Sequence, residues 1–222
     1  MIRKVTLFLL LKIQSWLVPM VPRHKVENLR LLDLKGGSHE LFYYDDQKAL
    51  IFLVQGNVCT IVRHAAARFQ ELKDIYKDQE VEFFMINSNL QDDRLTIREE
   101  AKEYNYDLII LVDDSQIIGE SLKLSRTGEV FVINPKNWSV AYIGAIDDRL
   151  TYEKQKEKAS KHVLKDASDD LLEDSSVSVP RTESLGCLIN FPHKSETQLI
   201  SYVDDFAPIL IENFTVFTLE AG

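Results

Sequence analysis

Two cysteines, Cys59 and Cys187, are the residues of this sequence best suited to covalent chemistry. Cys59 stands where the apolar run Ala49–Gln55 gives way to a helical pattern. A thiol at a helix N-terminus is favoured as the reactive thiolate, because the amides there attract negative charge, and Arg63 and His64 follow one turn later. The opposing interpretation is a small buried side chain, which many unpaired cysteines are.

A disulfide between the two cysteines is a second possibility. Cys187 lies 128 positions after Cys59, and two cysteines allow one internal bridge at most. Closing so long a loop would stabilise the fold by roughly 4 to 5 kcal/mol in the chain-entropy account. A bridge needs the two Cα atoms within about 7 Å, which the sequence alone does not give. The pair and two independent thiols are therefore both open.

The other titratable side chains form no pattern typical of a metal or acid–base site. The five histidines stand singly, without the spacing of familiar metal ligands. Two aspartate pairs, Asp113–Asp114 and Asp147–Asp148, have the chemistry to hold a metal or transfer protons. We instead expect them to cap exposed backbone amides. No metal and no other cofactor is predicted.

Composition indicates a globular protein with one buried core. The chain has 222 residues, of which 45% are hydrophobic, and a formal net charge of -9. This length and apolar content suffice for one well-buried domain. The negative charge, without a concentrated basic patch, argues against nucleic acid as a partner.

Hydrophobic periodicity predicts an α/β fold with a central mixed sheet and flanking helices. The run Ala49–Gln55 is typical of a strand buried on both faces. The inner face of the helix from Thr60 is predicted to hold Ile61, Ala65, Phe69, Leu72, Ile75 and Tyr76. Further along, we expect strands at 81–89 and 108–114, a polar helix at 92–106, a short helix, a hairpin over 129–143 and a long helix over 150–173.

The two ends of the chain are predicted to lie outside this domain. Residues 1–23 start with Arg3, Lys4 and an apolar run, which is typical of an export signal or anchor, but Lys12 interrupts the run. The segment is too short for a convincing membrane span. We expect a domain over 24–191 and a tail over 192–222, in a protein that is exported, periplasmic or membrane-anchored, with a cytoplasmic protein as the alternative.

Several segments, in order, resemble one family. They are VENLRLLDLKGG, ALIFLVQGNVCTIV, YKDQEVEFFMINSN, LVDDSQIIGESLKLSRTGEVFVIN, VAYIGAIDDR and RTESLGCLI. Over about residues 24–191 they resemble the thioredoxin-fold redoxins of the peroxiredoxin-like, AhpC/TSA-related type. The resemblance implies a thioredoxin-like fold with a cysteine at the first position of the thioredoxin Cys-x-x-Cys motif.

The resemblance implies that Cys59 is this redox-motif cysteine and that Cys187 matches the cysteine of the family's Thr-x-x-Gly-Cys segment. The sequence departs from the family pattern at two positions near Cys59. Thr60 stands where the family commonly has proline, and Val62 stands where the second motif cysteine would be. A vicinal dithiol is therefore impossible.

A third departure concerns the platform that faces the redox-motif cysteine in this fold. The fold normally has a cis proline after a threonine there, whereas Thr127 is followed by Gly128. A cis bond before a residue other than proline costs about 2.5 to 4 kcal/mol. We therefore expect no cis peptide at Gly128, and a looser platform for a substrate strand.

Two functions are compatible with these residues. In the first, the protein is a redoxin in which Cys59 exchanges disulfides with protein thiols or a thiol reductant, Arg63 assists electrostatically and Cys187 resolves the bond. The substrate-binding residues would then be Thr60, Thr127 and Gly128. In the second, the protein is a non-catalytic interaction module of the same fold, which the missing second motif cysteine favours.

Peroxidase, or antioxidant, activity is a less favoured alternative. Thr60 and Arg126 have the chemistry to position a peroxide beside a thiolate. In peroxiredoxins, however, the attacking cysteine matches the second motif position, which is Val62 here.

The C-terminal segment ISYVDDFAPILIENFTVFTLEAG resembles the start of a c-type cytochrome domain. Phe214, Phe217 and Thr218 stand at the places of the Cys-x-x-Cys-His motif that binds haem, so no haem is predicted. The alternative is an ordinary amphipathic tail.

Overall fold

The computed structural model describes residues 25–150 and 155–192. Residues up to Asn190 belong to one unit of the chain, and Phe191 and Pro192 belong to a second. The predicted leader over 1–23 and nearly all of the tail over 192–222 lie outside the described residues. Within the described part, no helix is long and apolar enough to cross a membrane.

A seven-stranded mixed sheet lies at the centre of the fold, in the order β2-β1-β5-β4-β3-β6-β7. The strands are β1 (Arg30–Asp33), β2 (Ser38–Glu40), β3 (Ala49–Gln55), β4 (Val81–Asn87), β5 (Ile109–Val112), β6 (Val130–Asn134) and β7 (Ser139–Gly144). β3, β4 and β5 are parallel, and β1, β6 and β7 pair antiparallel with their neighbours. This confirms the predicted α/β fold with a central mixed sheet.

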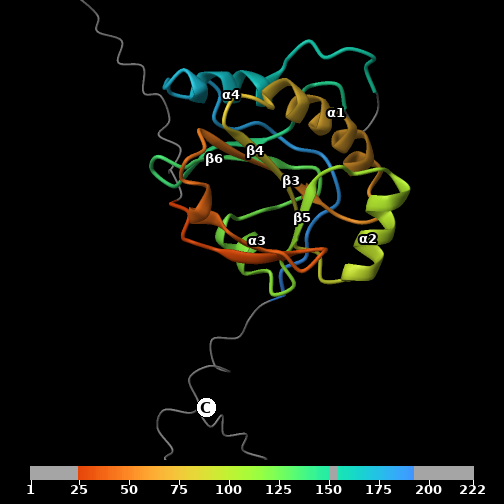
Figure 1. Ribbon diagram of the computed structural model, residues 1–222. Helices are drawn as coiled ribbons and strands as arrows, with labels where there is room; N and C mark the ends of the chain where they lie inside the picture. The colour runs from red at the N-terminus through yellow and green to blue at the C-terminus, as the bar shows by residue number, and fades with distance from the viewer. Residues whose placement is uncertain (1–24, 151–154, 193–222) are drawn as a thin grey trace, which may run out of the picture. The chain divides into compact units, whose positions relative to one another are not determined.

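Three helices, α1 (Thr60–Tyr76), α2 (Arg94–Glu103) and α4 (Val163–Leu172), pack with one face of the sheet into the main hydrophobic core. Figure 1 shows α1 and α4 on one side of the sheet and α3 (Ile117–Ser121) on the other. Every residue of β3 is buried, as its continuous apolar run predicts. β3 therefore fixes the position of the loop that follows it.

The buried stripe of α1 differs from the prediction at both ends of the helix. Ala65, Phe69, Leu72 and Tyr76 are buried as expected, but Ile75 is 49% exposed. At the N-terminal end of the helix, Val62 is fully buried, whereas Ile61 is only partly buried. The buried stripe therefore begins at Val62 rather than at Ile61.

The helix predicted over 150–173 is wrong over residues 155–162, because α4 begins only at Val163, and residues 151–154 lie outside the described residues. Residues 155–162 instead form a loop beside the carboxylate of Asp148. This carboxylate accepts hydrogen bonds from the amides of Ser160 at 2.8 Å and Lys161 at 3.0 Å, and from the Lys156 ammonium at 2.7 Å. Amides that bond to this carboxylate are not available to a helix ladder.

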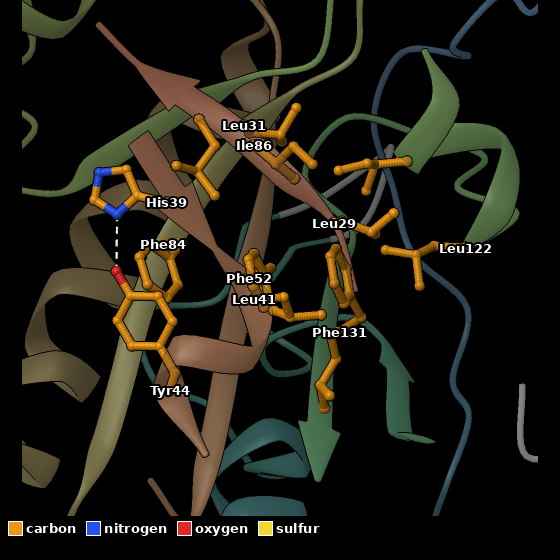
Figure 2. Close-up of a pocket in the computed structure, with 13 residues that line it drawn as sticks. Leu29, Leu31, His39, Leu41, Tyr44, Phe52, Phe84, Ile86, Leu122 and Phe131 are labelled. Atoms are coloured by element: carbon orange, nitrogen blue, oxygen red, sulfur yellow. Dashed lines mark hydrogen bonds between the residues drawn. The ribbon is translucent and has the colours of Figure 1, made fainter. Parts of the chain in front are cut away.

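The second face of the sheet is covered by the 3-10 helix η1 (Leu41–Tyr44) and by α3. Figure 2 shows the apolar side chains that meet there around a cavity of about 30 Å³. At its rim, His39 bonds to the Tyr44 hydroxyl at 2.8 Å and to Asp33 at 3.0 Å. The cavity has room for about one water molecule, so it is a packing defect of this layer rather than a ligand site.

Candidate redox site

A network of buried amides positions the loop between β3 and α1, which carries Cys59. Gln55 and Asn87 end the paired strands β3 and β4, and the Asn87 amide donates to Gln55 at 2.5 Å. Gln55 in turn donates to Asn57 at 2.9 Å, and the Asn57 backbone amide donates to Asp92 at 2.9 Å. Buried polar groups of this kind are costly unless paired, so the network fixes one loop conformation.

Cys59 is the N-cap residue of α1, as the sequence predicts, but it is not open to solvent. Only 3% of the residue is exposed, and it packs with the main hydrophobic core. Of the two interpretations left open for Cys59, burial agrees with the small buried side chain rather than with an accessible thiol. The cause of the burial is the chain that lies over Cys59, which comes from Thr127 and from the segment around Cys187.

Thr127 connects the two cysteines. Its hydroxyl donates a hydrogen bond to the Cys59 sulfur at 3.2 Å. The same oxygen accepts the backbone amide of Cys187 at 3.0 Å. Since the amide occupies a lone pair of the oxygen, the hydroxyl proton is directed at the sulfur.

Gly128 adopts a left-handed conformation with φ of +80°, and no peptide bond in the described part of the chain is cis. Its amide donates to Val54 on β3 at 2.7 Å, a bond that proline cannot make. A Cβ atom here would lie 3.0 Å from both Ile61 and the Leu185 carbonyl. The platform predicted to be loosened by glycine is thus hydrogen-bonded directly to the sheet.

The segment over 180–190, called the strap below, carries Cys187 across the end of the sheet. It begins beside β7, where the Ile143 amide donates to Pro180 at 3.1 Å. It then pairs antiparallel with the loop over 125–127, since the Thr127 amide donates to Cys187 at 2.9 Å and the Ile189 amide donates to Ser125 at 3.1 Å.

Side chains secure the strap at further points. The Arg126 guanidinium donates to the Gly186 carbonyl at 2.9 Å, and the Gln116 amide donates to the Asn190 carbonyl at 2.9 Å. A Cβ atom at Gly186 would lie 1.8 Å from the Thr127 carbonyl oxygen. Only glycine permits this close approach, which brings Cys187 beside Thr127.

The environment of Cys59 favours its thiolate. Burial raises the pKa of the thiol. Hydrogen bonds from the Thr127 hydroxyl, from the amides of Val62 and Cys187 and from the Cys187 thiol lower it by more than burial raises it. The net pKa therefore lies below its ordinary value. The Val62 amide approaches too loosely to count as a helix cap. The stabilisation therefore comes chiefly from Thr127 and less from the helix terminus that the sequence emphasises.

Cys187 is the opposite case. Its side chain is exposed and free, and Cys59 is also free. Partial burial, the hydrogen bond to Cys59 and the charge of Cys59 all raise the pKa of the Cys187 thiol. When the two cysteines together hold one proton, that proton therefore lies on Cys187, and the Cys187 thiol donates to the Cys59 thiolate.

Arg63 does not serve the sulfur directly. Its guanidinium makes a two-point ion pair with the buried carboxylate of Glu100, at 2.9 and 3.0 Å, and lies 4.1 Å above the centre of the Tyr104 ring. The largest influences on the Cys59 pKa do not include Arg63. Thr60, an exposed residue at the start of α1, accepts His64 through its carbonyl at 2.8 Å.

The first aspartates of the two predicted pairs hold the backbone in different ways. Asp113 accepts the amide of Gly119 in α3 at 2.8 Å. Asp147 accepts the Arg149 amide at 3.0 Å. Across the residues that the structure describes, no group of three or more His, Cys, Asp or Glu side chains is arranged to hold a metal ion.

A cleft of about 560 Å³ lies beside this site, along the N-terminal half of α1 and the loop after β7. Gly128 and Leu185, which neighbour Thr127 and Gly186, line one wall. Apolar residues such as Ile146 and several charged residues line the rest, and some of the charged residues pair with one another, such as Arg149 with Asp147 at 2.9 Å. Neither cysteine belongs to the lining, so the cleft does not open onto the sulfur atoms.

The structure brings together Cys59, Cys187 and Thr127, all three of which the sequence pointed to. Gly186 and Gln116, which hold the strap, and the Gln55–Asn87 pair under the loop were not predicted. Gly186 had a signal, because it directly precedes Cys187 in the Gly-Cys segment. The buried amides had only the polar ending of an apolar run.

Comparison with known proteins defines the class. The chain has the thioredoxin-like fold of an uncharacterized conserved protein from Geobacillus kaustophilus, with 22% identity, a TM-score of 0.67 and coverage of 80% of this chain and 96% of the other. A hypothetical protein from Sinorhizobium meliloti 1021 is similar, with 23% identity, a TM-score of 0.66 and coverage of 77% and 94%. A putative thiol:disulfide interchange protein DsbE from Chlorobium tepidum has 14% identity, a TM-score of 0.54 and coverage of 68% and 96%.

The AhpC/TSA family model matches residues 22–143. The chain therefore belongs to the AhpC/TSA family. This confirms the expected membership among thioredoxin-fold redoxins. No curated protein matches the chain.

Proposed function

We propose that this redoxin is a thiol–disulfide oxidoreductase in which Cys59 and Cys187 are the redox pair. The observation that supports the pair is the single Thr127 side chain, which donates to the Cys59 sulfur and accepts the Cys187 amide. Hydrogen bonding from the Cys187 thiol lowers the pKa of the Cys59 thiol and raises that of Cys187. The pair therefore replaces the vicinal dithiol that Val62 makes impossible.

The chemistry of the pair is two-electron exchange with thiols or disulfides of proteins. The oxidised pair reacts with a partner dithiol: the Cys59–Cys187 sulfur–sulfur bond breaks and the partner becomes a disulfide. The reduced pair reacts with a partner disulfide by the reverse exchange, which returns the partner to its thiols and forms the Cys59–Cys187 bond. A structural neighbour described as a putative thiol:disulfide interchange protein is compatible with this class.

The test is to incubate the reduced protein with oxidised glutathione and to follow its mass. We expect the wild-type protein to lose two hydrogen atoms and to keep no glutathione, because the second thiol displaces the first adduct. Cys59→Ser and Cys187→Ser are the matched controls, and neither can close the bond. A wild-type protein that retains glutathione on either cysteine, or never oxidises, would show that the two thiols are not a redox pair.

A non-catalytic interaction module is the second candidate, and the burial of Cys59 favours it. In that case the fold would serve partner binding, and Cys59 would be a packing residue. The two functions separate in the same experiment, because a packing thiol reacts only after denaturation. Because Cys187 is exposed and can react in either case, formation of the internal Cys59–Cys187 bond in the native protein is the outcome that excludes the module.

A further inference from the structure

The two sulfur atoms differ in access, and in the opposite sense to their predicted roles. Cys59 is 3% exposed and lies behind Thr127, whereas Cys187 is exposed. Leu188, the next residue of the strap, is 68% exposed. Because thiol–disulfide exchange requires one sulfur to approach another directly, access decides which sulfur of the pair is attacked.

The strap also occupies the backbone position beside Thr127. The bonds from Thr127 to Cys187 and from Ile189 to Ser125 place Arg126 opposite Leu188 as an antiparallel pair. A partner strand cannot take these same backbone groups while the strap is bound. In such a pair the amide and carbonyl of Leu188 point away from Arg126, toward the outer side of the strap.

We propose that partner proteins exchange disulfides with this protein at Cys187, on the outer side of the strap, and that Cys59 is the buried thiol that leaves and re-forms the internal bond. This inference rests on the proposed function and reverses the expected roles of the two cysteines. The partner is a protein segment with two thiols, exposed enough to reach the sulfur beside Leu188.

The disulfide exchange proceeds in two steps and needs no cofactor. A partner thiolate attacks the Cys187 sulfur of the oxidised pair, the internal sulfur–sulfur bond breaks, and its electron pair leaves on Cys59 as a thiolate. The second partner thiolate then attacks the partner sulfur of the mixed disulfide. The partner disulfide forms, and Cys187 departs as a thiolate that takes a proton from water.

The Thr127 hydroxyl assists the first of these steps. It lies 3.2 Å from the sulfur on which the leaving charge develops, and it donates to that sulfur. A leaving thiolate of low pKa departs faster, and its stabilisation in the reduced state makes the oxidised pair a better oxidant. The geometry therefore favours oxidation of partner dithiols, with a disulfide donor restoring the pair by the reverse steps.

The experiment traps mixed disulfides in single-cysteine variants of the full chain. Cys59→Ser retains Cys187, and Cys187→Ser retains Cys59. Each is mixed with a peptide that carries one cysteine activated as a disulfide with an aromatic thiol. Rates are compared at the plateau pH of each variant, so that both thiols are fully ionised. We expect the Cys59→Ser variant to react about tenfold faster or more, because Cys59 needs an opening of the strap.

Equal rates, or faster trapping at Cys59 in the folded Cys187→Ser variant, would overturn the inference. A circular dichroism spectrum checks that each variant is folded. The wild-type protein supplies the second measurement. Its oxidised pair is mixed with an excess of the reduced peptide and quenched with acid, and peptide mapping locates the mixed disulfide.

The wild-type mapping also separates this inference from the proposed function. A mixed disulfide on Cys187 supports the inference, and one on Cys59 contradicts it while the redox pair stands. Failure of the wild-type protein to form any internal disulfide would instead reject the redox pair itself.

Discussion

The hydroxyl of Thr127 lies 3.2 Å from the sulfur of Cys59 and donates a hydrogen bond to it, although 68 positions separate the two residues. The hydroxyl is aimed at the sulfur because the Cys187 amide occupies its oxygen at 3.0 Å. The electrostatic state of a buried thiol is thereby controlled from the strap. Substitutions at Thr127 or in the strap can therefore change the pKa of the Cys59 thiol while both cysteines stay intact.

Thr127→Val is expected to raise the pKa of the Cys59 thiol. A hydrogen bond to a charged group is worth roughly 1.5 to 3 kcal/mol, which corresponds to about one to two pH units. The titration is followed by the ultraviolet absorbance of the thiolate, in the Cys187→Ser background so that one thiol titrates. Thr127→Ser retains the donor and is the control. An unchanged titration in the valine variant would remove Thr127 from the site.

Arg63→Gln is expected to leave this titration nearly unchanged and to lower the midpoint of thermal unfolding. The reason is that Arg63 pairs with the buried Glu100 carboxylate, which the substitution leaves without its charge partner. Glu100→Gln in the same background should restore part of the loss. A rise in the Cys59 pKa as large as that from Thr127→Val would return Arg63 to the site.

Gly186→Ala is expected to lift the strap, because its Cβ atom would lie 1.8 Å from the Thr127 carbonyl oxygen. Loss of two backbone hydrogen bonds of about 1 kcal/mol each should speed alkylation of Cys59 by roughly ten- to thirtyfold. The measurement uses iodoacetamide in the Cys187→Ser background. Leu188→Ala, at an exposed strap position, is the control, and a rate no faster than its rate would contradict the close packing.

Gly128→Pro would restore the proline of the family pattern, but we expect it to destabilise this chain. Proline cannot adopt φ of +80°, and it lacks the amide that donates to Val54 at 2.7 Å. Gly128→Ala should cost about 1 to 2 kcal/mol for its conformation alone, plus its contacts with the strap. Gly36→Ala, at φ of +88° with open space around it, isolates the conformational part.

The free energy of unfolding for these glycine variants is measured in urea by linear extrapolation. We expect the order Gly36→Ala, Gly128→Ala, Gly128→Pro for increasing loss of stability. A proline variant as stable as the wild type would mean that the backbone at this position follows another path.

Asp148 gives a prediction for the pH dependence of stability. Hydrogen bonds from Lys156 and Ser160 and the Lys161 amide hold the pKa of its carboxyl well below the ordinary value of 3.8. Because the folded state favours the carboxylate, the stabilisation is fully present above the unfolded pKa and is lost as pH falls through the folded pKa.

The difference in thermal midpoint between the wild type and Asp148→Asn should therefore be largest above about pH 4 and shrink as the pH falls below it. Asp78→Asn, at an exposed position after α1, is the control and should leave the difference near zero throughout. A difference that grows toward acidic pH would contradict the assignment.

The sequence predicted the centre of the sheet well, because β3 and β4 are buried on both faces and their apolar runs leave little ambiguity. The continuous run over β3 placed Cys59 at the start of α1, and this is confirmed. The helix expected over 150–173 is absent over residues 155–162, because the carboxylate of Asp148 takes amides that a helix would need. A local periodicity cannot report a contact made twelve residues away.

The site was predictable in its residues but not in its roles. The family's Gly-Cys segment indicated Cys187, and the threonine that precedes the usual cis proline of the fold indicated Thr127. The sequence left open whether Cys59 is buried, because the strap that covers it lies more than a hundred positions later in the chain. Arg63 was assigned from its distance in sequence, whereas Glu100 on another helix determines its direction.

The strap has one more consequence, which concerns how this molecule meets its own copies. It runs along the outer edge of β7 and then beside residues 125–127, so it takes up backbone groups that would otherwise be open to intermolecular strand addition. A chain cut between α4 and the strap would bare both stretches once the strap dissociates. Self-association should therefore follow from proteolysis in this short region, even if the remaining core stays folded.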